Sequence, residues 1–187
     1  MDAIVGLIGG LVGVLVGALL SAAFTARGSR IDRTFEMHRE FESPDMLQAR
    51  YRASELLAAH PTATYTELRQ TLGRTATNDV WAVTGFYQRL WLAIRHHAIQ
   101  PAYVPELFGD TFVWWCDYSF HSQLLSSESE RAHHVRQLEA WLLRHSSDEM
   151  VARWRGANEH SPISVEPQLA PASPDAAPVL DAAPPLS

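Results

Sequence analysis

Residues 107–121, LFGDTFVWWCDYSFH, bring together many of the side-chain types that can do chemistry. Six aromatic residues share this stretch with the only cysteine of the chain, two aspartates and a histidine. Asp110, Asp117 and His121 could form a polar site for a metal ion or for acid–base catalysis. These three are therefore the candidate catalytic residues. Their positions on the helix that carries them determine whether their side chains can lie close together.

A helical wheel at about 100° per residue separates these polar residues from the aromatic ones. Asp117 and His121 lie one turn apart, but Asp110 is two turns, roughly 10 Å, from Asp117. No E-x-x-H or H-E-x-x-H spacing supports a metal site. The favoured interpretation is the solvent-exposed edge of an otherwise buried central helix. An ion pair with Arg89 or Arg95 would give Asp110 a structural role instead.

The single cysteine and the histidines give no further site. Cys116 falls on the apolar side of the wheel, with His121 on the opposite flank, so we predict a small buried residue with an inert thiol. His97 is predicted to lie inward beside Phe86 and Leu90. No C-x-x-C-H haem motif and no C-x-x-C pair is present. We therefore predict no metal and no cofactor.

Composition excludes several function classes. The chain has 187 residues and a formal net charge of −6, which argues against nucleic-acid binding because that needs a basic surface. It has fifteen arginines and no lysine, a bias that is typical of a GC-rich bacterial coding sequence. A lysine Schiff base and a Walker-type phosphate loop are both excluded.

The N-terminal segment has the pattern of a membrane anchor. No charged residue occurs from Ala3 to Phe24, and this length of helix spans roughly 33 Å, the thickness of a bilayer core. Arg27, Arg30 and Arg33 follow it and favour a cytoplasmic location for everything after the anchor. The sequence predicts a single-pass protein of the bacterial inner membrane with its N-terminus outside. A cleaved signal peptide is the competing interpretation, but no arginine or lysine precedes the apolar run.

Small residues recur at every fourth position of this segment, which puts them on one face of the helix. Such spacing lets two helices approach closely in lipid, so we predict a homo-oligomer that forms through the membrane helix. The residues of this face are Gly9, Gly13, Gly17 and Ser21.

The rest of the chain shows helical periodicity and no alternating strand pattern. A helix continues through residues 30–42, and Ser43-Pro44-Asp45 begins a new one, with serine as N-cap and proline in the first turn. Apolar periodicity, caps and breakers predict helices over residues 44–59, 64–72, 77–97, 105–126, 129–145 and 147–155.

These boundaries give a mainly α fold: an N-terminal transmembrane helix followed by a compact cytosolic helical bundle. Seven of the eleven prolines lie beyond residue 160, where no aromatic residue occurs, so that tail is predicted to be disordered. The predicted parts are an anchor (1–26), a juxtamembrane helix (27–43), the bundle (44–158) and the Pro/Ala-rich tail (159–187).

Two strings after the anchor, FEMHREFESPDMLQARYRASELL and VTGFYQRLWLAIRHHAIQPAYVPELFGDTFVWWCDY, support a resemblance over about residues 35–125. They resemble small bacterial membrane-anchored helical proteins that carry a domain of unknown function. The resemblance implies no activity and no catalytic residue, but it implies that the aromatic helix is architectural. The matching positions are Phe41, Ser43, Pro44, Met46, Ala49, Arg50, Phe86, Tyr87, Arg89, Leu90, Leu107, Phe108, Trp114 and Trp115.

The sequence predicts a non-enzymatic interaction or scaffold module that self-associates in the lipid bilayer and binds an unidentified cytosolic protein. The alternative is a membrane-bound enzyme or ligand sensor that uses Asp110, Asp117 and His121, with Arg50 or Arg89 as a further participant. Convergence of these side chains in a concave pocket would favour the alternative.

Overall fold

The computed structural model describes residues 2–125 and 128–157, and in the first helix it describes the side chains of residues 17, 18, 20–22 and from 24 onward. The described residues form helices and no strand, so the predicted mainly α fold is confirmed. The predicted tail, 159–187, lies outside the described residues. The elements are α1 (Asp2–Phe41), α2 (Pro44–Ala59), α3 (Tyr65–Ala76), α4 (Asn78–Arg95), the 3₁₀ turn η1 (Pro101–Tyr103), α5 (Val104–Trp115), the π-helix η2 (Cys116–Leu124), α6 (Glu130–His145) and α7 (Asp148–Ala157).

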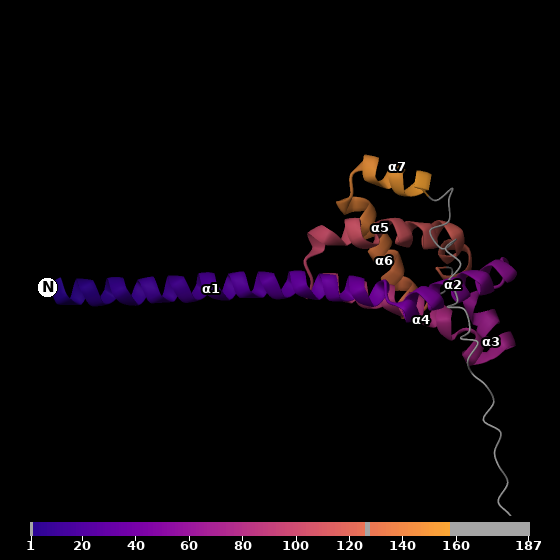
Figure 1. Ribbon diagram of the computed structural model, residues 1–187, viewed down its shortest axis with the longest axis horizontal. Helices are drawn as coiled ribbons and strands as arrows, with labels where there is room; N and C mark the ends of the chain where they lie inside the picture. Colours follow the sequence, from indigo (N-terminus) through magenta and orange to yellow (C-terminus); the bar gives the residue numbers. More distant parts are fainter. Residues whose placement is uncertain (1, 126–127, 158–187) are drawn as a thin grey trace, which may run out of the picture.

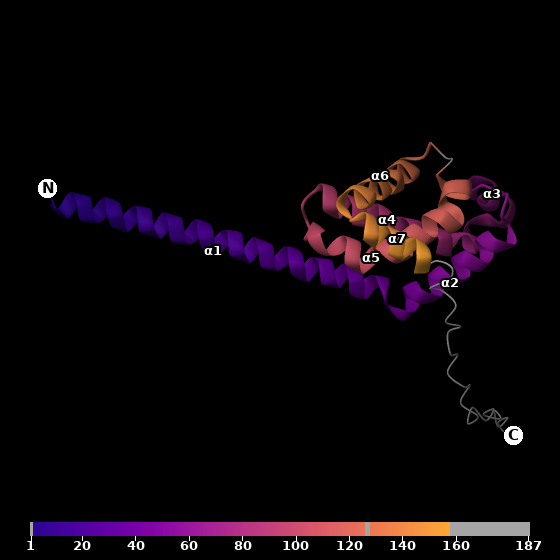
Figure 2. The same ribbon diagram turned by 90° about the horizontal axis from the view of Figure 1, so that it is seen from above.

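Helix α1 is one unbroken rod of 40 residues, about 60 Å long. Figures 1 and 2 show that only its C-terminal part touches the bundle, while its N-terminal part extends well beyond it. The predicted boundary between anchor and juxtamembrane helix lies inside this rod. Within the part of the chain whose side chains are described, no helix combines the length and the apolar character needed to cross a membrane. Most of the predicted anchor, residues 3–16, lies outside that part.

The last turns of α1 pack against the bundle. Phe41 is almost completely buried, and His38 and Phe35 contact the rings of Phe108 and Tyr103. A buried hydroxyl adds a polar link: the Thr34 Oγ1 accepts a hydrogen bond of 2.9 Å from the backbone N–H of Gln100.

Local capping signals account for most helix starts. The Ser43 hydroxyl accepts a hydrogen bond from the Met46 N–H, and Ser129 caps α6 in the same way. Thr64 and Glu67 form a reciprocal capping box at the start of α3. Each cap satisfies backbone N–H groups that have no partner in the first turn of a helix.

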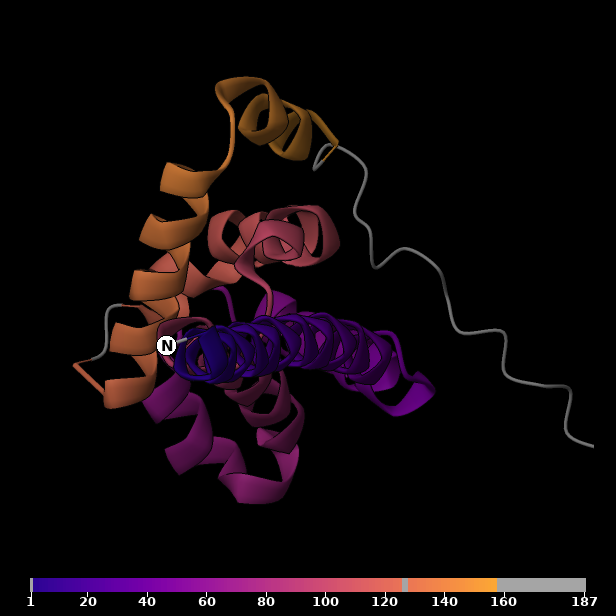
Figure 3. The same ribbon diagram turned by 90° about the vertical axis from the view of Figure 1, so that its left-hand side faces the viewer.

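The core lies between α4 and the helices around it. α4 packs against α2 on one side and α6 on the other, and α5 packs against α6 and α7. The view along α1 in Figure 3, together with Figure 1, shows α7 on the opposite side of the bundle from α3. Aromatic rings from α1, α4, α5 and η2 meet at the centre, and the fully buried ones are Phe41, Phe86, Tyr87, Phe108, Phe112, Trp115 and Phe120.

Two helix ends differ from the prediction. α3 continues one turn past the predicted stop at Gly73, which adopts φ 82° inside the element and so kinks it. α4 ends at Arg95, before the predicted His97. His97 adopts φ 53° in the following turn and is exposed, so the prediction of an inward His97 was wrong because the helical period stops before it.

The close contact of α5 with α7 depends on a glycine. Gly109 is buried on the face of α5 against which the ring of Trp154 lies, and Trp154 is itself buried. A Cβ atom on residue 109 would come within 2.5 Å of Trp154 Cη2, well inside van der Waals contact. The absence of a side chain at Gly109 is therefore what lets α7 dock.

We predict that Gly109→Ala destabilises the bundle by about 1–3 kcal/mol, because the new methyl group overlaps a rigid indole ring. Urea unfolding in mild detergent, followed by tryptophan fluorescence, measures this, since all six tryptophans lie between residues 81 and 154. In a Trp154→Leu background the same change should cost much less. Gly156→Ala is the control, because its Cβ would meet no atom within 4 Å; equal losses at both glycines would contradict the prediction.

Candidate functional site

The aromatic stretch divides between α5 and η2, and five of its six rings lie in the core, while Tyr118 is exposed. Phe108, Phe112, Trp115 and Phe120 are at most 1% exposed. Phe108, Phe112 and Phe120 meet rings of α1 and α4 at centroid distances of 4.8–6.0 Å, within the range of favourable aromatic pairs. Trp115 stacks on Phe120 at 5.3 Å. These four aromatic residues are thus accounted for by packing, as the helical wheel indicated.

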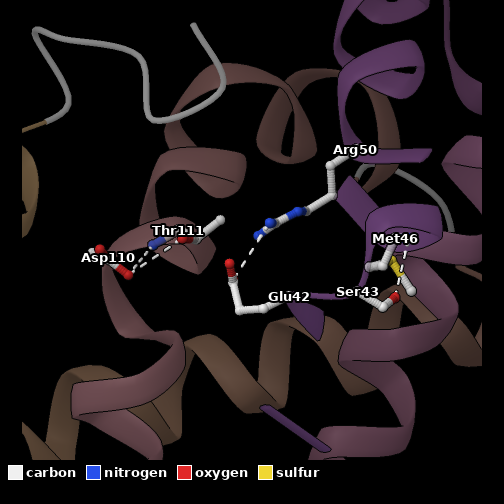
Figure 4. A network of polar contacts seen from close by, with 6 residues as sticks. All are labelled: Glu42, Ser43, Met46, Arg50, Asp110 and Thr111. Carbon is white, nitrogen blue, oxygen red and sulfur yellow. Dashed lines mark hydrogen bonds and ion pairs between the residues drawn. The ribbon is translucent and has the colours of Figure 1, made fainter. Parts of the chain in front are cut away.

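The three candidate catalytic residues are all exposed, and the structure does not gather them into one site. The Asp110 carboxylate turns back on its own helix and accepts hydrogen bonds from the backbone N–H and the hydroxyl of Thr111 (Figure 4). His121 is hydrogen-bonded to Glu139 of α6. Neither Asp110 nor Asp117 belongs to a group of ligating side chains among the described residues.

Asp110 does not form the ion pair with Arg89 or Arg95 that the sequence suggested. Arg89 pairs with Glu40 at the end of α1, and no ion pair joins Asp110 to Arg95 in the described ranges. The prediction of an Arg89–Asp110 contact was wrong because the sequence could not show that the end of α1 would lie along α4 and supply a nearer acid.

The π-helix changes which residues share a face. In η2 the backbone bonds run from residue i to i+5, as in the 2.6 Å bond from the Leu125 N–H to the Phe120 carbonyl. Residues five apart then lie roughly above one another, whereas a 100° wheel puts them on different sides. The prediction that His121 lies on the flank opposite Cys116 was therefore wrong, and η2 turns both toward α6.

Cys116, His121 and Glu139 come together at the contact of η2 with α6. One potential ligand atom of each lies within 4.8 Å of the others, and the His121 Nε2 is 2.8 Å from the Glu139 Oε1. Cys116 is buried beneath the other two residues, and the side chain of His121 is half exposed. This group could not be predicted from the sequence, because Glu139 is on another helix and because an α-helical wheel does not represent a π-turn. A thiol, an imidazole and a carboxylate are ligand types that zinc-class cations accept.

The thiol of Cys116 is held in its neutral form. Burial raises its pKa well above the usual range, and the nearby charges of Glu139 and Asp117 raise it further. Because the thiolate is the nucleophile, Cys116 is poorly suited to nucleophilic catalysis at neutral pH. This agrees with its interpretation from sequence as a buried, unreactive residue.

A second polar group lies where α1 meets α2. Arg50 is 6% exposed; its guanidinium lies 4.0 Å from the centroid of the Phe41 ring and 3.4 Å from the Glu42 carboxylate (Figure 4). Tyr87 is buried nearby, and its hydroxyl has no hydrogen-bond partner among the described residues. Burial raises the Tyr87 pKa well above its usual value, and the positive charge of Arg50 only partly opposes this.

The start of α4 borders a shallow surface hollow of about 250 Å³. Trp81 stacks on the Tyr65 ring at a centroid distance of 6.1 Å, and two arginines lie beside this pair. Such a lining could accept a small anion, although Trp81 is already covered on one side by the guanidinium of Arg131 at 3.2 Å. The lining residues are Tyr65, Arg69, Arg74, Thr77, Asn78 and Trp81.

In comparisons with protein-family models, curated proteins and solved structures, the chain has no match. The resemblance to membrane-anchored bacterial proteins with a domain of unknown function stays a prediction.

We predict that Tyr87→Phe leaves the bundle equally stable or up to about 1 kcal/mol more stable at pH 7, because it removes a buried hydroxyl without a partner. The folded protein keeps Tyr87 protonated above pH 10, where the unfolded chain loses that proton. Tyr87 thus makes stability fall as pH rises above about 10, by up to about 1.4 kcal/mol per pH unit.

The variant should lose this part of the alkaline slope. Urea unfolding at pH 7 and near pH 11 measures both effects, with the exposed Tyr118→Phe as the control for loss of a phenolic hydroxyl at pH 7. A loss of more than 1 kcal/mol at pH 7 on Tyr87→Phe would show instead that the hydroxyl makes a stabilising contact.

Proposed function

We propose that this protein is a membrane-tethered helical module that holds its bundle beside the cytoplasmic face of a bacterial inner membrane and presents it to a cytosolic protein. One observation carries the proposal: the N-terminal part of α1 extends beyond the bundle (Figure 1), and two of its large apolar side chains are exposed. Leu20 is 55% exposed and Phe24 72% exposed. Covering each such side chain is worth about 1.5–3 kcal/mol, which a bilayer would supply.

The length and charge pattern of the segment fit a bilayer better than a protein groove. Its uncharged run from Ala3 to Phe24 matches the hydrocarbon thickness, and Arg27, Arg30 and Arg33 come immediately after it. The positive residues favour the cytoplasmic side, which puts the bundle in the cytosol. A bundle that continues directly from the anchor helix would stay close to the lipid headgroups.

The proposal includes self-association through the small-residue face of Gly9, Gly13, Gly17 and Ser21. Gly9 and Gly13 lie outside the residues whose side chains are described. Gly17 and Ser21 are exposed, and a Cβ on Gly17 would meet no atom within 4 Å, so the bundle leaves this part of the face open. A second copy of α1 could approach closely there.

The bundle is proposed to bind rather than to catalyse. An enzyme or sensor built on Asp110, Asp117 and His121 requires these side chains to line a shared cavity. All three are exposed, and none borders the surface hollow next to α4. The interaction module is therefore favoured over the enzyme.

Membrane tethering predicts that the chain stays with bacterial membranes after alkaline carbonate extraction, at its full N-terminal length. The double variant Val12→Arg, Val16→Arg should leave the membrane fraction, because each charge near the centre of the segment costs about 2.5–3.5 kcal/mol. The control carries two arginines at its edge, Phe24→Arg and Ala26→Arg, and should stay. Recovery of the unaltered chain in the soluble fraction, or a mature N-terminus near residue 26, would reject the anchor.

Self-association predicts that Gly13→Leu weakens the dimer in membranes by about tenfold or more, because a leucine separates the two helix backbones. Val12→Leu adds bulk on a different face and is the matched control. Chemical cross-linking in native membranes measures the dimer fraction, and no change on Gly13→Leu would end this part of the proposal.

A further inference from the structure

Three side chains with metal-binding atoms meet between η2 and α6. Cys116 and His121 come from η2, and Glu139 comes from α6. It is the one group of its kind among residues 2–125 and 128–157. Three different ligand types thus meet within reach of a single ion.

The π-helix is what makes this arrangement possible. It contributes two ligands from one element at a spacing of five residues, which an ordinary α-helix would point in different directions. Longer π segments are rare because their hydrogen bonding is less favourable, and single π-turns occur frequently at functional sites. η2 has nine residues, and the Trp115 Nε1 and Ser119 Oγ around it are buried without hydrogen-bond partners in the described chain. The segment therefore has a local cost in buried polar groups that lack hydrogen bonds.

The chemical types of the three ligand atoms determine which class of metal ion the group would bind. A sulfur, an aromatic nitrogen and a carboxylate oxygen together suit Zn²⁺ and its substitutes such as Co²⁺. Mg²⁺ and Ca²⁺ prefer shells made of oxygen alone, so they fit poorly. Two of the three ligands are anionic when metal-bound, and Asp117 adds a further negative charge nearby.

The distances require only small adjustments. In a tetrahedral zinc site, ligand atoms lie about 3.4 Å (oxygen to nitrogen) to about 3.6 Å (sulfur to nitrogen) apart, from the usual bond lengths. The present separations range from 2.8 Å between His121 and Glu139 up to at most 4.8 Å. The side chains of His121 and Glu139 are 50% and 21% exposed, so both have room to rotate toward a buried Sγ.

We propose that Cys116, His121 and Glu139 form a three-ligand site for a divalent cation of the zinc class, with the fourth coordination position open toward solvent. The ion would replace the His121–Glu139 hydrogen bond and would connect η2 to α6. Because it binds only the folded arrangement, it would raise the stability of the bundle by mass action. The proposal is independent of membrane tethering and can fail or hold without it.

Cobalt(II) titration of the full chain in detergent micelles tests this site specifically. A cobalt–thiolate bond gives a near-ultraviolet charge-transfer band, and only Cys116 can produce it because it is the only cysteine. We expect this band together with the strong visible bands of tetrahedral cobalt, and we expect Zn²⁺ to abolish both. Zn²⁺ should also raise the unfolding temperature of the unaltered chain.

Cys116→Ser removes the thiol but also changes the core. Variants of the two less buried ligands, His121 and Glu139, therefore give a test that does not depend on Cys116→Ser. His121→Gln and Glu139→Gln should each weaken cobalt binding by at least about tenfold. Asp117→Asn removes a neighbouring acid from the same π-helix, and His133→Gln removes an exposed histidine of α6; both should bind cobalt with less than about threefold change. The proposal is overturned if no charge-transfer band forms, or if a band forms whose affinity is the same in the His121 and Glu139 variants as in these controls.

Discussion

The burial of Phe41 among aromatic rings of the bundle is the contact from which the shape of this protein follows. Its ring lies 4.8 Å from Phe86 and 5.7 Å from Phe108, centroid to centroid, and the Arg50 guanidinium covers another side at 4.0 Å. Phe41 is also the last residue of α1, so this contact fixes the direction of the whole rod. Together with the Thr34–Gln100 hydrogen bond, it holds the C-terminal part of α1 on the bundle, and the unbroken helix then carries its N-terminal part beyond the bundle (Figure 1).

This rigid attachment ties the position of the bundle to whatever covers the N-terminal half of α1. Among the residues of α1 whose side chains are described, Thr34 is the first that is buried. It lies seven positions after Arg27, a rise of only about 10 Å. If lipid covers the apolar run, the bundle stands almost in contact with the headgroups, and the turn around η1 is the part of the bundle nearest to them (Figure 1). A flexible linker would have allowed the bundle to move away from the membrane, and no such linker lies between Asp2 and Phe41.

The features that could be predicted from the sequence are those that depend on interactions between residues close together in the chain. Ser43 acts as the predicted N-cap, and the helix predicted over residues 129–145 forms with Val135, Leu138 and Leu142 fully buried, because capping and helical periodicity depend only on near neighbours. The candidate site depended on two non-local facts. A π-turn has no sequence signal that a 100° wheel detects, and the approach of Glu139 to Cys116 depends on how α6 packs against α5. The pairing of Arg89 with Glu40 was missed for the same reason.

The negative charges near Cys116 have opposite effects on the site with and without a bound ion. Without one, Glu139 and Asp117 disfavour the thiolate, and burial adds to their effect, so the pKa of Cys116 is raised and the residue is inert. A divalent cation between Cys116 and Glu139 reverses the sign of that interaction, because both anions are then attracted to the same centre. Without an ion, the Glu139 carboxylate disfavours the thiolate of the buried Cys116. With an ion, the same carboxylate is a second ligand. This change in the role of Glu139, more than the spacing of the residues, distinguishes a metal site from an accidental hydrogen bond between His121 and Glu139.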